Sequence, residues 1–196
     1  MTSPVLHLLA GSNGSGKSTF AEHVLLPTTH LPFVNADLIA EEIWPDDREA
    51  QALGALEVSR LAAKRREFLL RRGTSFVTET VFSHPSKVSV VQHAQVLGYA
   101  VTLHVIVVPE ELAVARVADR VRAGGHQVPE QKIRDRYRRL FPLVAQALRS
   151  ADSGVVYDNS SLDEPFRRIA RYRYGQIVGE PVWPIWAPET LRLMGP

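Results

Sequence analysis

The sequence predicts an α/β fold, a three-layer sandwich in which helices cover both faces of a mainly parallel sheet. Apolar runs typical of buried strands alternate with helical segments along most of the 196 residues, which is the pattern of a parallel sheet. The first apolar run, VLHLLA, leads directly into the glycine-rich stretch GSNGSGKST. A strand that ends in such a loop is typical of α/β proteins that bind phosphate groups.

The strands are predicted from short apolar runs that are bounded by turn residues. The run at 100–108 is the strongest of them, since strands buried on both faces are apolar at almost every position. The predicted strands are 5–10, 32–37, 75–80, 100–108 and 154–160.

The helices are predicted from apolar periodicity and from the glycines and prolines at their ends. The first is expected to end at Pro27, because proline removes a backbone donor, and Pro142 is expected to kink or restart the last. Gly98 is expected to close the helix before it. The predicted helices are 17–26, 49–72, 85–97, 109–125 and one beginning at 129–141.

These elements are predicted to form one domain, residues 1–175. Residues 176–196 are rich in proline and tryptophan, as in VWPIWAP, and are predicted to form an irregular tail. Two alternatives stay open for this tail: it packs over the core, or it is a docking strip for a partner.

The composition excludes several classes of protein. There is no cysteine, so neither a disulfide framework nor a cysteine metal site is expected. No apolar run approaches the ~20 residues of a membrane span, and the start of the chain lacks the pattern of a signal peptide. The net charge of +2 is too small to indicate nucleic acid as a partner. We therefore expect a cytoplasmic protein without membrane attachment.

The stretch GSNGSGKST fits the phosphate-binding pattern G-x-x-x-x-G-K-[ST], or P-loop, from Gly11 to Ser18. Its backbone N–H groups form a nest for anions, and the following helix adds its positive end. The lysine of the pattern contacts the β- and γ-phosphates, and the Ser18 hydroxyl ligates Mg²⁺. No N/T-K-x-D segment of the guanine-recognising type occurs, so a GTPase is not expected. The predicted ATP-binding residues are Gly11, Ser12, Asn13, Gly14, Ser15, Gly16, Lys17, Ser18 and Thr19.

Two acidic residues follow predicted strands and are candidates for chemistry. Asp37 is expected to end the second strand, where its carboxylate can accept the proton of an incoming hydroxyl. The alternative is that Asp37 only caps the next helix. Glu79, with Thr80 beside it, ends the third strand and is predicted to hold substrate hydroxyls or a metal-bound water. Its alternative role is a hydrogen bond at the edge of the sheet.

Arginine is concentrated between residues 116 and 139, around the connector GGHQVP. The two glycines of this connector predict a hinge, and the basic residues beside it predict an Arg-rich helical lid that closes over the phosphates. The alternative is a solvated helix face. The predicted lid residues are Arg120, Arg122, His126 and Arg134.

With these segments together, the chain from about Val5 to Asn159 resembles the zeta-toxin family of P-loop kinases. GSNGSGKST is similar to the family's ATP loop. NADLIA is similar to the segment that carries the family's catalytic base, and the base corresponds to Asp37. TETVFS is similar to the segment whose glutamate binds substrate, which lands on Glu79. RVRAGGHQVPEQKI is similar to the segment with two phosphate-contacting arginines. The first of these arginines corresponds to Arg120. The second corresponds to His126, so that a histidine stands where the family has an arginine.

The resemblance implies a P-loop NTPase fold and an ATP- and Mg²⁺-dependent kinase with Lys17, Asp37 and Arg120 as catalytic residues. It implies transfer to a sugar hydroxyl of a UDP-activated amino sugar, UDP-N-acetylglucosamine, and an antitoxin protein as a partner. The residues alone lead only to a small P-loop kinase. A nucleoside or polynucleotide kinase and a non-catalytic ATP-binding regulatory module stay open as alternatives.

Overall fold

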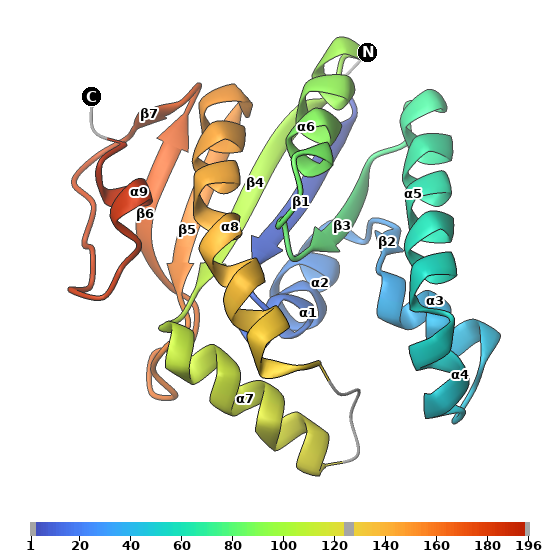
Figure 1. The fold of residues 1–196 in the computed structure, drawn as a ribbon. Coiled ribbons are helices and arrows are strands. Elements are labelled where there is room, and N and C mark those ends of the chain that lie inside the picture. The colour runs from blue at the N-terminus through green and yellow to red at the C-terminus, as the bar shows by residue number, and fades with distance from the viewer. Residues whose placement is uncertain (1–2, 124–127, 195–196) are drawn as a thin grey trace.

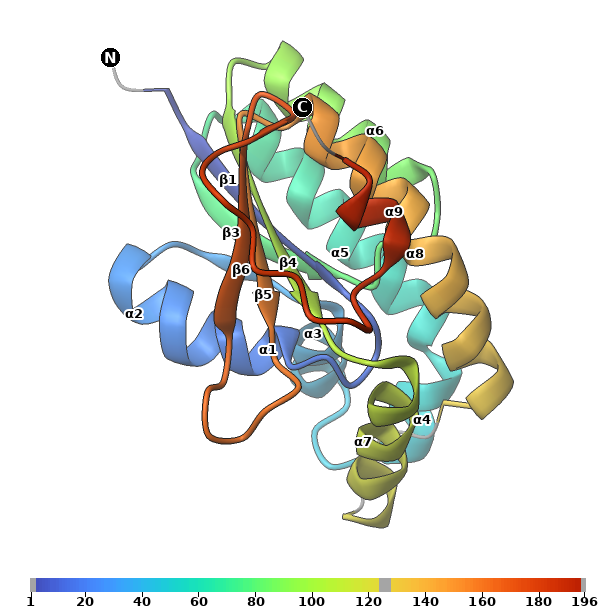
Figure 2. The ribbon, with the colours of Figure 1, turned by 90° about the vertical axis from the view of Figure 1, so that its left-hand side faces the viewer.

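A computed structural model of the protein describes residues 3–123 and 128–194. Within these residues, a seven-stranded sheet has the strand order β2-β3-β1-β4-β5-β6-β7, with helices on both faces (Figures 1 and 2). The strands are β1 (Val5–Gly11), β2 (Phe33–Val34), β3 (Phe76–Thr80), β4 (Ala100–Val107), β5 (Ser153–Asp158), β6 (Arg167–Arg173) and β7 (Gln176–Ile177). The predicted α/β sandwich is confirmed.

The helices divide between the two faces of the sheet. Figure 2 shows α1 and α2 on one face, and α5, α6 and α8 on the other. The helical elements are α1 (Lys17–Phe20), the π-helix η1 (Ala21–Leu25), α2 (Leu26–Thr29), α3 (Ala36–Ile43), α4 (Arg48–Leu53), α5 (Ala55–Arg71), α6 (Ser86–Val96), α7 (Glu110–Arg122), α8 (Glu130–Ser150) and α9 (Glu189–Arg192).

The parallel part of the sheet explains where the site lies. Strands β2, β3, β1, β4 and β5 all run parallel, with Leu8 of β1 opposite Thr78 of β3 and Leu103 of β4. Only β6 and β7 pair antiparallel. The carboxyl ends of five strands therefore lie along one edge, which is where ligands bind in open α/β sheets.

Two predicted helix boundaries were wrong. Pro27 does not end the first helix, because it lies in the first turn of α2, where its missing N–H is not needed. The predicted helix 49–72 is broken at Gly54, where a Cβ would overlap the ring of Trp44. Pro142 lies inside α8, which continues past it to Ser150, so the expected restart of the helix does not occur.

The C-terminal segment packs on the sheet rather than extending from it. The Val182 N–H donates to the carbonyl of Ile169 in β6 at 2.8 Å. Leu191 of α9 is fully buried, and its carbonyl accepts a hydrogen bond from the Tyr172 hydroxyl at 3.2 Å. This packing matches the first of the two alternatives for the tail.

In the part of the chain that the structure describes, no helix is long and apolar enough to cross a membrane.

Two histidines, the buried His104 and the half-buried His7, form a pair on the α1 face of the sheet. The His7 Nδ1 and His104 Nε2 atoms lie 3.0 Å apart, and His104 stacks on Tyr157. Burial and the neighbouring His7 lower the pKa of His104 to about 3. The unfolded chain therefore binds a proton at this position between pH 6.5 and 3 that the folded protein does not.

We expect the free energy of unfolding to fall as the pH drops through this window. One proton contributes a slope approaching about 1.4 kcal/mol per pH unit. His104→Gln should show a flatter pH dependence than the wild type in urea unfolding measured from pH 7 to pH 4. His23→Gln, at an exposed position, is the control and should keep the wild-type slope. Equal slopes in all three proteins would show that His104 does not cause the effect.

Candidate active site

A cavity of about 870 Å³ lies at the carboxyl edge of the parallel strands. Four segments that follow parallel strands contribute to its lining. The P-loop provides Lys17 and Ser18, and the segment after β2 provides Asp37. The end of β3 provides Glu79, and the segment after β5 provides Asn159. The structure thus brings the predicted nucleotide loop and both predicted acidic residues into one space.

The glycines of the P-loop allow backbone contacts that no larger residue would permit. Gly14 and Gly16 have φ values of 74° and 93°, in the left-handed region. A Cβ on Gly14 would lie 2.6 Å from the carbonyl oxygen of Ala113 in α7. A Cβ on Gly16 would lie 2.5 Å from the Asn159 amide nitrogen. The loop is therefore closely enclosed by the segments that follow β4 and β5.

Lys17 is the buried cation of the site. Its exposed fraction is 8%, and its Nζ donates to the carbonyl of Ser12 at 2.8 Å. Burial lowers the pKa of Lys17, and the carboxylates of Glu79 and Asp37 oppose this shift. The charges of Arg120 and Arg136 lower it further. These positive charges converge on the P-loop, where a triphosphate would stabilise them.

Ser18 and Glu79 meet beside Lys17. The Ser18 hydroxyl lies 3.2 and 3.0 Å from the two carboxylate oxygens of Glu79. Burial raises the pKa of Glu79, while the Lys17 charge and the bond from Ser18 lower it. Hydroxyl, carboxylate and phosphate oxygens with waters are the donors that Mg²⁺ takes. The pair therefore fits the predicted magnesium ion at Ser18, with Glu79 beside the ion.

The structure corrects the local setting of Asp37. The predicted strand 32–37 is shorter, because β2 ends at Val34 and α3 begins at Ala36. The helix cap is Asn35, whose Oδ1 accepts from the N–H groups of Asp37 at 2.6 Å and Leu38 at 3.3 Å. Asp37 lies in the first turn of α3, exposed, and lines the cavity. The alternative that Asp37 is the cap is therefore wrong.

A basic wall, made of Arg116, Arg120, Lys132 and Arg136, closes the α7 and α8 side of the cavity. Arg136 reaches the P-loop, where its guanidinium donates to Asn13 Oδ1 at 3.3 Å. Of these four residues only Arg120 was predicted as a site residue. The others belonged to the same arginine-rich stretch, but the sequence did not show which side of each helix faces the loop.

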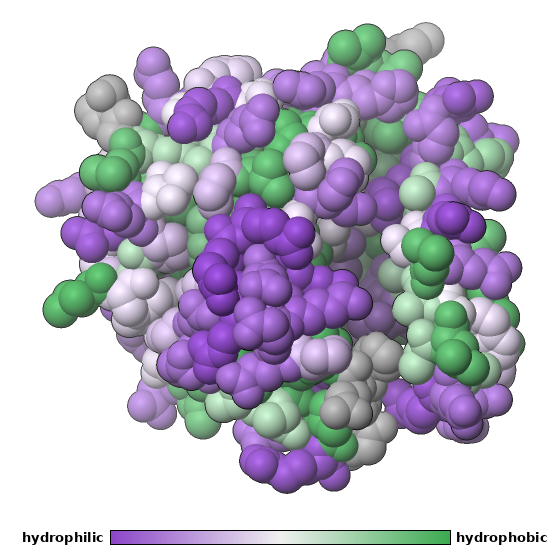
Figure 3. Space-filling model, in the orientation of Figure 1, coloured by the Kyte–Doolittle hydropathy of each residue, from purple (hydrophilic) through white to green (hydrophobic). Residues whose placement is uncertain are grey.

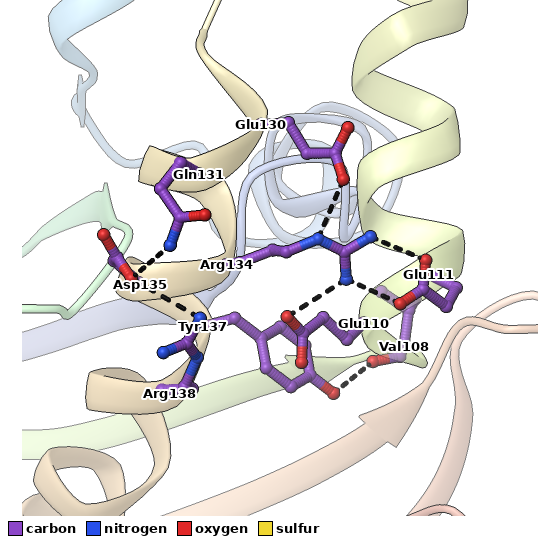
Figure 4. Close-up of polar contacts among 9 residues, drawn as sticks. All are labelled: Val108, Glu110, Glu111, Glu130, Gln131, Arg134, Asp135, Tyr137 and Arg138. Carbon is purple, nitrogen blue, oxygen red and sulfur yellow. Dashed lines mark hydrogen bonds and ion pairs between the residues drawn. The ribbon is translucent and has the colours of Figure 1, made fainter.

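Arg134 and Arg122 are not among the residues that line the cavity. The Arg134 guanidinium contacts Glu110, Glu111 and Glu130 at 3.3, 2.5 and 2.9 Å, so that it joins α7 to the first turn of α8 (Figure 4). Arg122 is exposed and pairs with Asp119. These acidic partners explain why neither guanidinium is directed at the phosphate site. His126 lies outside the described residues, so the predicted lid is described only in its flanking helices.

The surface over the first half of α8 is strongly hydrophilic (Figure 3). Its basic residues include Arg138 and Arg139, which are exposed and do not line the cavity. The arginine-rich stretch thus has two parts: a solvated face, as one alternative expected, and the basic wall that faces the P-loop.

The segment after β5 also lines the cavity, although no residue of it was predicted as a site residue. The Asn159 amide donates to the Ser15 carbonyl of the P-loop at 2.9 Å. Phe166 lines the same end of the cavity and packs its ring edge-on to Phe20 of α1, with centroids 5.1 Å apart. The only signal in the sequence was that the polar residues YDNS follow a strand.

Comparison with known proteins places the chain in a family. A family model described as Zeta toxin matches residues 1–161. A Haemophilus influenzae protein described as uncharacterised is 29% identical over 128 residues, covering 65% of this chain and 88% of that protein.

Two solved structures share the fold at low identity. The AvrRxo1-ORF1:-ORF2 structure with ATP has a TM-score of 0.61 at 20% identity and covers 91% of this chain; the overlap spans 61% of that chain. The PezAT toxin–antitoxin system of Streptococcus pneumoniae has a TM-score of 0.60 at 13% identity, covering 99% of this chain and 85% of that one. The family model spans most of the residues that build the fold and the P-loop cavity, and the chain belongs to the Zeta toxin family of P-loop kinases.

Proposed function

We propose that this kinase transfers the γ-phosphoryl group of ATP to a hydroxyl of a UDP-activated amino sugar, with UDP-N-acetylglucosamine as the first candidate. The observation that carries the proposal is the single cavity that joins Lys17 and Ser18 of the P-loop to Asp37 and Glu79. A cavity of about 870 Å³ is large enough for a nucleotide and a second small molecule, since ligand sites usually measure ~300–1,000 Å³.

The residues divide the reaction between them. The P-loop N–H groups and Lys17 hold the β- and γ-phosphates in line with the acceptor hydroxyl. Asp37 accepts the hydroxyl proton as the acceptor oxygen bonds to phosphorus and the bond between the γ-phosphorus and the bridging oxygen breaks, releasing ADP. The basic wall stabilises the charge that develops on the transferring group.

The magnesium ion would be held by Ser18, with Glu79 beside it. When bound, such an ion neutralises phosphate charge. Glu79 and the neighbouring Thr80 would then also orient the acceptor hydroxyls at the end of β3.

We further propose an antitoxin protein as a partner, because the PezAT structure is described as a toxin–antitoxin system.

A nucleoside or polynucleotide kinase is the second candidate. The basic wall favours it, because four cations on one side of the cavity could hold the phosphates of an oligonucleotide as well as those of ATP. The test is to incubate the protein with ATP and Mg²⁺ and one acceptor at a time: UDP-N-acetylglucosamine, nucleosides or oligonucleotides. Mass spectrometry of the products identifies the acceptor. We expect a phosphorylated UDP-sugar; a phosphorylated nucleoside or oligonucleotide would replace the proposal with the second candidate.

Arg120 and Arg122 offer a matched comparison on one helix. Arg120→Ala should lower kcat by about tenfold or more while the affinity for ATP changes less, because a cation facing the γ-phosphate acts mainly on developing charge. Arg122→Ala should leave both unchanged, since Arg122 pairs with Asp119 at the surface. Steady-state kinetics and ATP titration measure the two quantities. Equal kcat values in both variants would remove Arg120 from the mechanism.

A further inference from the structure

We propose that Arg66 and Lys87 form an anion-binding site for the acceptor, so that the kinase selects acceptors with an oxyanion group. This inference rests on the proposed kinase function and names the substrate class of the same cavity. The group recognised is a phosphate or carboxylate located away from the hydroxyl that receives the phosphoryl group.

The two cations come from different helices and meet at one end of β3. Arg66 lies on α5 and Lys87 on α6, and both line the large cavity together with Asp37, Glu79 and Thr80. They also line a small adjoining pocket beside Glu79 and Thr80.

Neither cation has an acidic partner within residues 3–123 and 128–194. No salt bridge or side-chain hydrogen bond of the described residues involves either of them. Glu67, the neighbour of Arg66 in sequence, instead contacts Arg71 at 2.6 Å and His93 at 3.4 Å. Arg134, by contrast, contacts the carboxylates of Glu110, Glu111 and Glu130.

The surroundings make this arrangement unfavourable without a ligand. Both side chains are only partly exposed. Burial lowers the pKa of Arg66, and burial with the Arg66 charge lowers the pKa of Lys87. Two like charges that are partly desolvated and lack a counter-ion cost free energy. An oxyanion that enters the cavity would relieve this cost for both.

The donor chemistry fits an oxyanion. A guanidinium presents a planar fork that matches phosphate or carboxylate, and an ammonium adds a point charge. Hydroxyls of Ser59, Thr80 and Ser83 line the same cavity and can donate further hydrogen bonds. An acceptor held at this end can direct a hydroxyl toward Asp37. Sugar phosphates, sugar acids and the diphosphate of a UDP-sugar all satisfy this chemistry.

The test uses inorganic phosphate as the probe and keeps the P-loop occupied. The protein is saturated with Mg²⁺ and a non-hydrolysable ATP analogue, and phosphate is titrated by calorimetry. We expect the wild type to bind one further phosphate. Arg66→Gln and Lys87→Gln should each bind it about tenfold or more weakly, the loss expected for a charged hydrogen bond. The matched controls Arg65→Gln and Lys64→Gln, both at exposed positions of α5, should bind as the wild type does. Acetate titrated in the same way shows whether a carboxylate replaces the phosphate.

A second measurement separates a ligand site from a structural role. Without ligand, Arg66→Gln and Lys87→Gln should melt at the wild-type temperature or above it, because each removes a repulsion. A clear fall in melting temperature with phosphate binding unchanged would mean that the two side chains only pack over the core. Absence of a further phosphate in the wild type, or its undiminished binding by both variants, would overturn the proposal.

Failure of the anion site and failure of the proposed kinase function give different results. If phosphate binds through Arg66 and Lys87 but no acceptor is phosphorylated, the anion site stands and the proposed transfer fails. If transfer occurs, the two variants should raise KM for an anionic acceptor about tenfold or more and leave KM for ATP unchanged. A kinase that phosphorylates neutral N-acetylglucosamine as efficiently as N-acetylglucosamine 1-phosphate would contradict the inference while keeping the function.

Discussion

Lys17→Ala is expected to weaken ATP binding by about tenfold or more and to lower phosphoryl transfer by roughly a hundredfold or more, the scale seen when one preorganised charge contact is removed. Lys17 is the most deeply buried cation of the cavity, and its ammonium is bonded only to the Ser12 carbonyl among the described residues. A triphosphate in the P-loop would give this charge its counter-ion. ATP titration and product formation measure the two effects.

The fold should survive this change. A buried ammonium is costly without a counter-ion, so Lys17→Met, which keeps the length of the side chain, should melt at the wild-type temperature or above it. Lys64→Ala, at an exposed position of α5, is the control and should bind ATP normally. Wild-type turnover by either Lys17 variant would show that the P-loop does not hold the transferred phosphate.

Asp37→Asn is expected to reduce transfer to the acceptor by roughly a hundredfold or more, since a general base typically contributes ~10²–10⁴-fold. The variant keeps the shape of the side chain, and the α3 cap is Asn35 rather than Asp37. The melting temperature should therefore change little. ATP binding should persist, because Lys17 and Ser18 are unchanged. Product formation with the identified acceptor, run beside ATP titration, measures the difference.

The control for Asp37→Asn is Glu49→Gln, which removes an acidic group from the first turn of α4. It should keep wild-type transfer, because Glu49 does not line the cavity. If Asp37→Asn and Glu49→Gln both transfer within a few-fold of the wild type, Asp37 acts only on the helix and another group must accept the proton.

The parallel strands and the P-loop could be predicted because local sequence specifies them. Buried parallel strands require apolar runs, and the P-loop requires its glycines and lysine at fixed spacing. β6 was missed because its sequence, RRIARYR, has four arginines among seven residues. Its buried residues include Ile169 and Tyr172, and the Tyr172 hydroxyl donates to the Leu191 carbonyl of α9, a contact that no local pattern in the sequence shows.

The walls of the cavity could not be predicted in the same way. Arg120 and Arg134 look alike in the sequence, and only the packing of α7 on α8 decides that one lines the cavity and the other bonds to Glu111. Arg66 and Lys87 lie 21 positions apart in sequence, in the separately predicted helices 49–72 and 85–97. Their meeting beside Thr80 depends on how α5 and α6 cover the sheet.

The measurement that tests the central claim most directly is the fate of the γ-phosphoryl group. The wild type is incubated with Mg²⁺ and ATP labelled at the γ-phosphate, with UDP-N-acetylglucosamine present or absent, and label in the sugar nucleotide and in inorganic phosphate is counted. We predict that the label passes to the sugar nucleotide in proportion to the ADP formed, and that Asp37→Asn removes this transfer. Label found only in inorganic phosphate, at the same rate with and without the acceptor, would contradict the account.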